Sequence, residues 1–181
     1  MPESSTVYKP GAVLITEEEI AAVVARLGKQ ISADYRDRHP ILLNLLKGGV
    51  VFLADLIRQI TIAHQIDFLR VSSYDNGTSS SGNVRIIDDL TGNVEGRDVL
   101  IVEDVLDTGK TLAYIVDVLK LRSPNSIEVC ALLRKRSPRT EGVHVGYLGK
   151  EIPDVFVVGY GLDYNEKYRH LPHIAKLIVP R

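Results

Sequence analysis

A helix with one apolar face is the first feature that the hydrophobic pattern predicts. Thr16 and Glu19 form the sequence of a capping box, which satisfies free amide groups at a helix start. Apolar residues then recur every three or four positions, as on one buried helix face: Ile20, Val23, Val24, Leu27 and Ile31. The helix is expected to run to about Arg38, because His39-Pro40 disfavours helical geometry.

Continuous apolar runs follow, separated by further amphipathic segments. Short apolar runs are typical of strands that are buried on both faces of a parallel sheet. The expected strands are Ile41–Leu46, Ile66–Tyr74, Val84–Leu90, Val99–Glu103, Ile127–Leu133 and Phe156–Gly161. Further helices are expected after the Gly48-Gly49 turn and after Asp107. This alternation predicts an α/β fold with a mainly parallel central sheet flanked by helices.

Length and composition are those of one globular unit. The chain has 181 residues, of which 45% are hydrophobic and 25% charged. This is enough for one domain with a substantial core. We expect a single domain over residues 1–181, with a core over about 16–152 and a small hood formed by the chain ends, about 1–15 and 153–181.

Charge and cysteine content narrow the class of protein. A formal net charge of −1 argues against a surface built to bind nucleic acid or an anionic membrane, but it leaves room for a small basic pocket. The single cysteine, Cys130, makes no intrachain disulfide and is expected to be a buried strand residue. The N-terminus lacks the apolar stretch of a signal peptide, and no run approaches the about 20 apolar residues of a membrane span. A cytoplasmic protein is therefore expected.

Two adjacent acids, Glu103 and Asp104, end the strand that begins at Val99. Parallel sheets bind ligands at the carboxyl ends of their strands. Adjacent carboxylates there repel each other unless a cation or hydroxyl donors compensate, and a ribose diol with a bound magnesium ion provides both. The alternative is a pair of solvated loop acids.

The next residues, Asp107 to Thr111, have the composition of a phosphate loop. A helix N-terminus offers unpaired amides and the positive end of a dipole, and Gly109 permits the close approach of an anion. The alternative is that Asp107 serves only as the N-cap of the following helix. Gly109-Lys110-Thr111 is not part of a Walker A loop, because Asp104 stands where that motif requires glycine. We therefore expect strand, loop and helix to bind the sugar and phosphate of a phosphorylated ribose.

The segment VLIVEDVLDTGKTL, residues 99–112, resembles the phosphoribosyl pyrophosphate signature of the type I phosphoribosyltransferases, and most of all that of their hypoxanthine-guanine branch. The similarity extends roughly from Ile15 to Ile178. It implies the type I phosphoribosyltransferase fold and a magnesium-dependent enzyme of purine salvage. Such an enzyme transfers the 5-phosphoribosyl group of phosphoribosyl pyrophosphate to hypoxanthine or guanine, and gives IMP or GMP and pyrophosphate.

The resemblance also implies roles within the signature. Glu103 and Asp104 would hold the ribose hydroxyls, partly through Mg²⁺. Asp107 would be the catalytic base near N7 of the purine, since a proton must leave the nitrogen that receives the ribosyl group. The loop residues that would surround the ribose and its 5′-phosphate are Asp107, Thr108, Gly109, Lys110 and Thr111.

A pyrophosphate site and a lid follow from the same resemblance. Lys47 and Gly48 match a pyrophosphate loop with a strained cis bond before Lys47, and Arg169 matches a further pyrophosphate contact. The alternatives are a Gly-Gly turn with a surface lysine, and a surface arginine. Ser73-Tyr74 precede the polar stretch Asp75–Asn83, which matches a lid over the reacting centre.

The purine site is implied in the last part of the chain. Lys135 matches a lysine that bonds the 6-oxo group, and an ammonium group, which only donates, favours an oxo group over the amino group of adenine. Phe156 matches the aromatic residue that stacks on the base, and the main chain around Val157 would read the base edge. Asp163 matches a second magnesium-associated acid. The alternatives are a surface lysine and a core phenylalanine.

Other functions stay open at this point. A xanthine-preferring or broad 6-oxopurine phosphoribosyltransferase would carry the same motifs. An RNA-binding attenuation regulator on the same fold would need a basic outer face, which a net charge of −1 supports poorly. An inactive relative is disfavoured because every charged site residue is present. The family expectation for assembly is a homodimer or a homotetramer.

Overall fold

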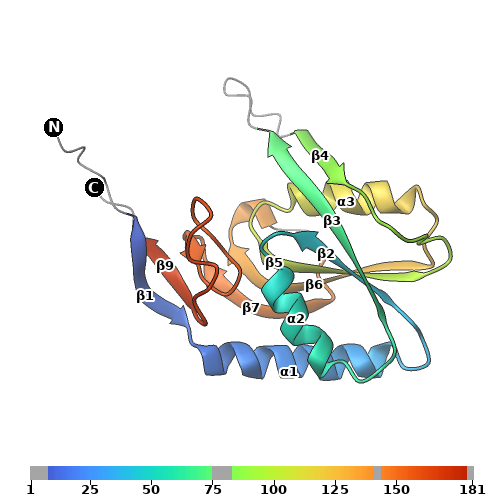
Figure 1. Ribbon diagram of the computed structural model, residues 1–181, viewed down its shortest axis with the longest axis horizontal. Coiled ribbons are helices and arrows are strands. Elements are labelled where there is room, and N and C mark those ends of the chain that lie inside the picture. Colours follow the sequence, from blue (N-terminus) through green and yellow to red (C-terminus); the bar gives the residue numbers. More distant parts are fainter. Residues whose placement is uncertain (1–7, 75–82, 141–143, 179–181) are drawn as a thin grey trace.

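The computed structural model describes residues 8–74, 83–140 and 144–178, and the larger of its two sheets has six strands in the order β4-β3-β2-β5-β6-β7 (Figure 1). The strands are β2 (Ile41–Leu46), β3 (Gln65–Tyr74), β4 (Asn83–Asp88), β5 (Asp98–Leu106), β6 (Ser126–Arg136) and β7 (Tyr147–Pro153). Neighbouring strands are parallel except β3 and β4, which are antiparallel. The expected α/β fold with a mainly parallel sheet is confirmed.

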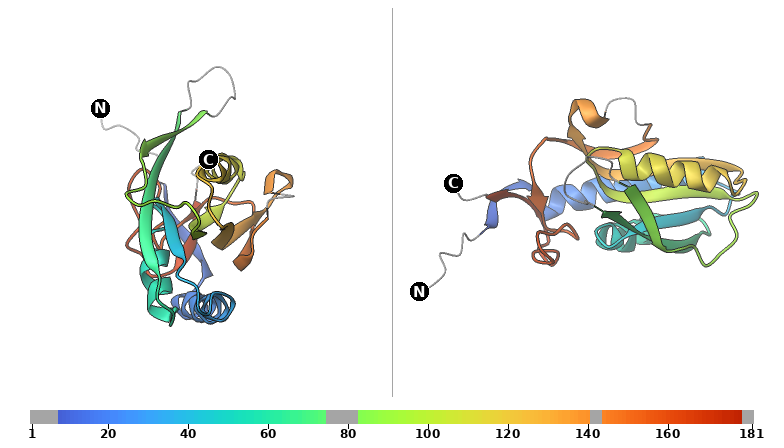
Figure 2. Two further views of the ribbon diagram at one scale, coloured as in Figure 1. Left: turned by 90° about the vertical axis from the view of Figure 1, so that its right-hand side faces the viewer. Right: turned by 90° about the horizontal axis from the view of Figure 1, so that it is seen from above.

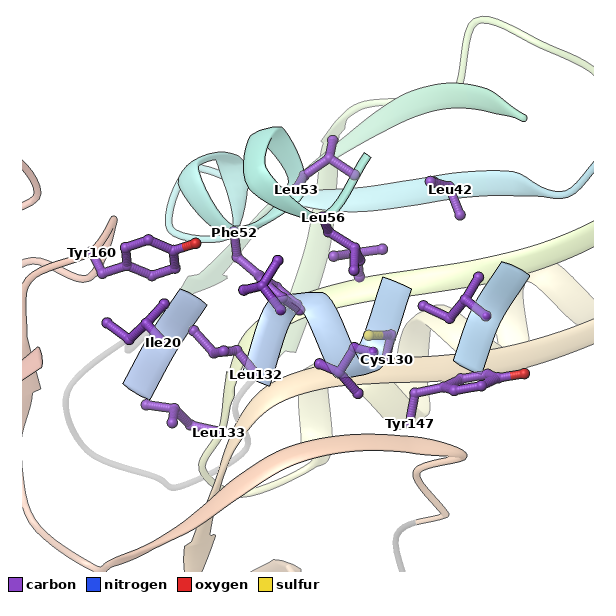
Figure 3. Packing of buried hydrophobic residues seen from close by; sticks show 14 of the residues in the cluster. Ile20, Leu42, Phe52, Leu53, Leu56, Cys130, Leu132, Leu133, Tyr147 and Tyr160 are labelled. Carbon is purple, nitrogen blue, oxygen red and sulfur yellow. The ribbon is translucent and has the colours of Figure 1, made fainter. Parts of the chain in front are cut away.

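Helices cover both faces of this sheet (Figure 2). They are α1 (Glu17–Asp34), α2 (Val50–Gln59) and α3 (Lys110–Lys120). On one face, Phe52 and Leu56 of α2 belong to a cluster with Cys130 and Leu132 of β6 (Figure 3). On the other face, α3 buries Ile115. Cys130 is thus the buried strand residue that was expected. No helix in the described ranges is long and apolar enough to cross a membrane.

The two chain ends meet in a second, antiparallel sheet at one end of the molecule (Figure 1). It consists of β1 (Lys9–Ile15), β9 (Ile174–Ile178) and β8 (Val157–Val158), with β9 in the middle. This is the small hood expected from the chain ends. The segment after β8 packs closely against the loop after β2. Gly161 lies so near this loop that a Cβ added to it would overlap the carbonyl oxygen of Gly48.

The first helix begins as expected and ends early. Thr16 N donates to Glu19 Oε2 at 2.9 Å and Glu19 N donates to Thr16 Oγ1 at 3.3 Å, so the capping box is present. The helix ends at Asp34 rather than near Arg38. Asp37 has a φ of 62°, in the left-handed region, so the chain leaves the helical path before the proline is reached.

Several strands differ from the expectation. Strands β5 and β6 each run three residues past the expected last residue, to Leu106 and Arg136. The strand expected over Phe156–Gly161 is only Val157–Val158, because the next three residues have φ values of 100°, 50° and 93°, which no strand adopts. The strand expected over Val84–Leu90 ends at Asp88. Strand β7 is absent from the sequence-based expectation, because Gly149-Lys150-Glu151 interrupts its apolar pattern, and it is an edge strand paired only with β6.

Candidate active site

A cavity of about 650 Å³ opens where β2, β5 and β6 end, next to the segment that follows β8. Its lining includes the predicted site residues Lys47, Gly48, Asp104, Asp107, Lys135, Phe156, Val157, Asp163 and Arg169. These residues come from distant parts of the chain. They meet because β5 lies between β2 and β6, so that the carboxyl ends of all three strands share one edge of the sheet.

A smaller cavity of about 110 Å³ lies against the loop between β5 and α3. Its lining includes Glu103, Thr108, Gly109 and Thr111. Asp107 lines both cavities, so the loop runs between them. Gly109 has a φ of 69°, a conformation that favours glycine, and it directs the chain into α3. Lys110 begins the helix and is exposed, and it lines neither cavity.

The two adjacent acids are held out of water. Asp104 is 8% exposed, and its Oδ1 accepts a hydrogen bond from Val105 N at 2.7 Å. The Oε2 atom of Glu103 is buried, and it has no hydrogen-bond partner among the described residues. Burial raises the pKa of both carboxyls, and the neighbouring charge of Asp104 raises that of Glu103 further. Among the described residues, the charge of Arg169 opposes this rise at Asp104, but neither acid forms an ion pair.

Buried contacts hold the loop that follows β2 against these two acids. Asn44, in the middle of β2, is fully buried and its Nδ2 donates to Val102 O of β5 at 3.0 Å. A Cβ added to Gly49 would overlap that same Nδ2, and one added to Gly48 would overlap Asp104 Oδ2. Both glycines are therefore required for close packing. Asn44 was not singled out from the sequence, although a polar residue inside the run ILLNLL was the available signal.

Lys47 and Arg169 share a carboxylate that the sequence analysis missed. The Leu46-Lys47 peptide bond is cis, as expected. Glu166 Oε1 lies 3.2 Å from Lys47 Nζ, and Glu166 Oε2 lies 3.2 Å from the Arg169 guanidinium. Hydrogen bonds from these two cations lower the pKa of Glu166. Asp163 Oδ1 lies 2.9 Å from the Arg169 guanidinium, so this acid, predicted to accompany a metal, is paired with an arginine here.

A second charge cluster surrounds Asp107. Its Oδ2 lies 2.5 Å from Lys135 Nζ, and its Oδ1 lies 3.3 Å from the Arg139 guanidinium. Arg139 also bonds Asp154 Oδ2 at 2.9 Å. Lys135 is only 8% exposed, and its carbonyl oxygen accepts a hydrogen bond from the buried Thr140 hydroxyl at 2.8 Å. The surface-lysine alternative is therefore wrong. Arg139 and Asp154 had no sequence signal that marked them.

Phe156 lies at the cavity rather than in the core. Its side chain is 48% exposed, so the core-phenylalanine alternative is wrong. Tyr164 packs edge-on against it, with ring centroids 5.7 Å apart, and Tyr8 of the opposite chain end stacks on Tyr164 at 4.5 Å. Val157 is buried and pairs with Lys176 of β9. The hood thus presents one aromatic face to the cavity and fixes the main chain beside it.

The predicted lid falls largely outside the described part of the chain. Ser73 and Tyr74 end β3, where they pair with Val84 and Asn83 of β4. Their side chains and residues 75–82 lie outside the described residues.

Comparison with known proteins identifies relatives over nearly the whole chain. The phosphoribosyl transferase domain family matches residues 14–165. The chain is 47% identical over 169 residues to the hypoxanthine phosphoribosyltransferase of Escherichia coli K12, covering 92% of this chain and 95% of that protein. It is 49% identical over 165 residues to the hypoxanthine-guanine phosphoribosyltransferase of Bacillus subtilis 168, covering 91% of this chain and 92% of that protein. It also matches the bifunctional protein TilS/HprT of Listeria innocua at 47% identity, where it spans only 26% of that protein's length.

Solved structures agree with these matches. The hypoxanthine phosphoribosyltransferase of Staphylococcus aureus superposes with a TM-score of 0.88 at 47% identity, covering 93% of this chain and 92% of that one. The hypoxanthine-guanine phosphoribosyltransferase of Bacillus anthracis, with a HEPES molecule in its active site, superposes with a TM-score of 0.88 at 37% identity. That match covers 95% of this chain and 99% of the other.

Proposed function

The chain belongs to the hypoxanthine-guanine phosphoribosyltransferases, the purine salvage branch of the phosphoribosyl transferase family, and on this premise we propose which of its residues carry the reaction. The substrates are phosphoribosyl pyrophosphate and a 6-oxopurine base, hypoxanthine or guanine. The observation that carries the proposal is the single cavity in which Asp104, Asp107, Lys135 and Arg169 meet from three parts of the chain. Positioning and charge compensation are the main sources of catalysis.

Glu103 and Asp104 hold the ribose hydroxyls and a magnesium ion. The buried, unpartnered Oε2 of Glu103 and the raised pKa values of both acids fit a site that is completed by a cation. The described residues contain no group of three or more ligating side chains placed to hold a metal. Mg²⁺ would therefore take further oxygen ligands from substrate and water, which is its usual preference. When bound, it would neutralise charge on the departing pyrophosphate.

The phosphates are bound at two glycine-containing loops. The loop Thr108–Thr111 surrounds the 5′-phosphate, supported by the left-handed Gly109 and by the positive dipole end at the start of α3. Lys47, Gly48 and Arg169 bind the pyrophosphate. The guanidinium of Arg169 suits this role because its donors form a fixed fork that matches phosphate oxygens.

The base lies between the hood and the end of β6. Phe156 stacks on the purine, the main chain around Val157 reads its edge, and Lys135 donates to the 6-oxo group. Asp107 accepts the purine proton as the new bond to the ribose carbon forms. Asp163 contributes to the magnesium site and to the purine site. Through its contact with the Arg169 guanidinium, it also orients that side chain. Ser73 and Tyr74 begin the lid, which excludes water from the reacting centre.

The direct test is pyrophosphate release from phosphoribosyl pyrophosphate, measured with hypoxanthine and with guanine, with and without Mg²⁺. Release that requires both a base and Mg²⁺ is expected. Without Mg²⁺, at least a 100-fold loss of rate is expected, since metal stabilisation of this charge is on the order of several kcal/mol. Salt-sensitive RNA binding without any pyrophosphate release would favour the attenuation regulator instead.

We also propose an assembly, a domain organisation and a location for the protein. A homodimer or homotetramer is the expectation from the family. A single domain over residues 1–181 agrees with the family match over residues 14–165 and with the shared cavity of the hood and the larger sheet. We propose a cytoplasmic location, which the single free cysteine, Cys130, supports because a reducing compartment keeps thiols free.

A further inference from the structure

The two cations assigned to pyrophosphate binding are both paired with a carboxylate of the same chain. Glu166 bridges them, with one carboxylate oxygen 3.2 Å from Lys47 Nζ and the other 3.2 Å from the Arg169 guanidinium. All three residues line the cavity of about 650 Å³. A carboxylate therefore lies where the proposed function requires a pyrophosphate oxygen pair.

We propose that Glu166 is a positioning residue that occupies the place of a pyrophosphate oxygen pair between Lys47 and Arg169, and that it must be displaced when pyrophosphate or phosphoribosyl pyrophosphate binds. The proposal rests on the pyrophosphate site of the proposed function. By competing with the ligand for Lys47 and Arg169, Glu166 lowers the affinity for pyrophosphate. It thereby speeds the release of this product after each turnover.

The exposure of the three side chains supports a displaceable contact. Those of Lys47 and Glu166 are 53% and 65% exposed, and exposed ion pairs contribute little to stability. Arg169 is only 26% exposed and has other partners: it donates to Gly161 O at 2.7 Å and lies 2.9 Å from Asp163 Oδ1. When Glu166 leaves, Arg169 is therefore still held at the cavity while Lys47 is free to follow the ligand.

The backbone around Glu166 keeps its carboxylate near this position without using it. Glu166 N donates to Asp163 Oδ2 at 2.8 Å, and the residue has a φ of 60°. Because this tether is a main-chain hydrogen bond, replacing the carboxylate by an amide leaves it in place. Glu166→Gln therefore removes the competing charge while the loop retains its main-chain contact.

The test is the affinity for magnesium pyrophosphate, measured by calorimetry on the wild-type chain of 181 residues, on Glu166→Gln and on a matched control. Asp117→Asn is the control, because it also removes an exposed carboxylate from an ion pair, with Lys120 at 3.4 Å on α3, but lies outside the cavity. Glu166→Gln is expected to lower Kd for pyrophosphate about 2- to 10-fold, the range for the loss of two competing ion pairs, one exposed and one partly buried. Asp117→Asn is expected to leave Kd within twofold of the wild type.

Steady-state kinetics give a second readout that a purely structural role would not move. In Glu166→Gln, KM for phosphoribosyl pyrophosphate and the inhibition constant of pyrophosphate should both fall, and kcat should fall with them if product release limits turnover. An unchanged or higher Kd for pyrophosphate in Glu166→Gln, with a wild type that binds pyrophosphate, would overturn this inference alone. A wild type that binds no magnesium pyrophosphate would overturn the proposed pyrophosphate site itself.

Discussion

Asp107 lies between two cations, and this fixes the direction of its carboxylate. Lys135 Nζ contacts one oxygen at 2.5 Å, and the Arg139 guanidinium lies 3.3 Å from the other. The ammonium group assigned to the 6-oxo group of the purine thus touches the acid assigned to N7. A purine that binds Lys135 through its oxo group is brought toward Asp107 by the same contact.

Asp107→Asn keeps the shape of this side chain and removes the proton acceptor. We expect kcat to fall about 10²- to 10⁴-fold with hypoxanthine and with guanine, the range found for general acid–base residues. Asp154→Asn is the matched control, because it removes a carboxylate from the same cluster without lining the cavity, and it should lose far less activity. Thermal unfolding checks that both variants fold. If Asp107→Asn kept most of its activity with both bases, the assignment of the base would be wrong.

Residues with roles in local motifs were predictable, and residues whose roles come from distant contacts were not. The capping box of Thr16 and the loop at Gly109 depend on near neighbours, so a short segment specifies them. Glu166 acquires its significance from Lys47, which is 119 positions away in the chain. Arg139 likewise meets Asp107 only because η1 (Pro138–Thr140) follows β6 at the site. No spacing rule connects such pairs.

Strand β5 carries important acidic residues near both of its ends. Its carboxyl end carries the acid pair, and its first residue, Asp98, anchors the opposite end. Asp98 accepts hydrogen bonds from Arg38 Nε at 2.8 Å, Asn125 Nδ2 at 2.7 Å and the Ser126 hydroxyl at 2.6 Å. The side chain of Asp98 is 12% exposed, and the Arg38 guanidinium, followed by Ser126 and Asn125, lowers its pKa to about 2.

Asp98→Asn is therefore expected to lower the free energy of unfolding by about 1–2 kcal/mol at pH 7, less than the full pKa shift implies because Arg38 is partly exposed. A carboxyl whose folded pKa is depressed contributes stability above its ordinary pKa and loses it as pH falls. The difference in the free energy of unfolding between wild type and variant should fall by pH 3 to about half of its value at pH 7. Urea unfolding at pH 7, 5 and 3 measures it, with Asp88→Asn, an exposed and weakly paired acid, as control. A difference that stayed constant with pH would contradict the role of the ionised carboxylate.

Elements were predictable where the apolar pattern was continuous. Strand β2 has the expected bounds, Ile41–Leu46, because it is buried on both faces and leaves a plain signal. Strand β7 is an edge strand with polar residues at its centre, so its pairing with β6 overrides a weak local pattern. The turns at Gly159 and Gly161 shorten β8 because the hood must pass close to the carbonyls of Gly48 and His173.

The order of the strands explains how one chain assembles all parts of the site. Because β5 lies between β2 and β6, the acid pair stands between Lys135 and the loop after β2, which is proposed to bind pyrophosphate. The antiparallel sheet of the chain ends then brings Phe156 and Arg169 to the same cavity. The sequence predicted the α/β fold and the hood, but the distances between the charged groups depend on this three-dimensional order.

The most direct test of the central claim is a competition in which the protein receives limiting phosphoribosyl pyrophosphate, Mg²⁺ and equal amounts of hypoxanthine, guanine, xanthine and adenine. The nucleotides formed are then separated and quantified. IMP and GMP are expected to account for most of the product, with little AMP, because Lys135 offers only donors to position 6 of the base. XMP as the main product would favour the xanthine-preferring or broad alternative, and formation of no nucleotide would contradict the account as a whole.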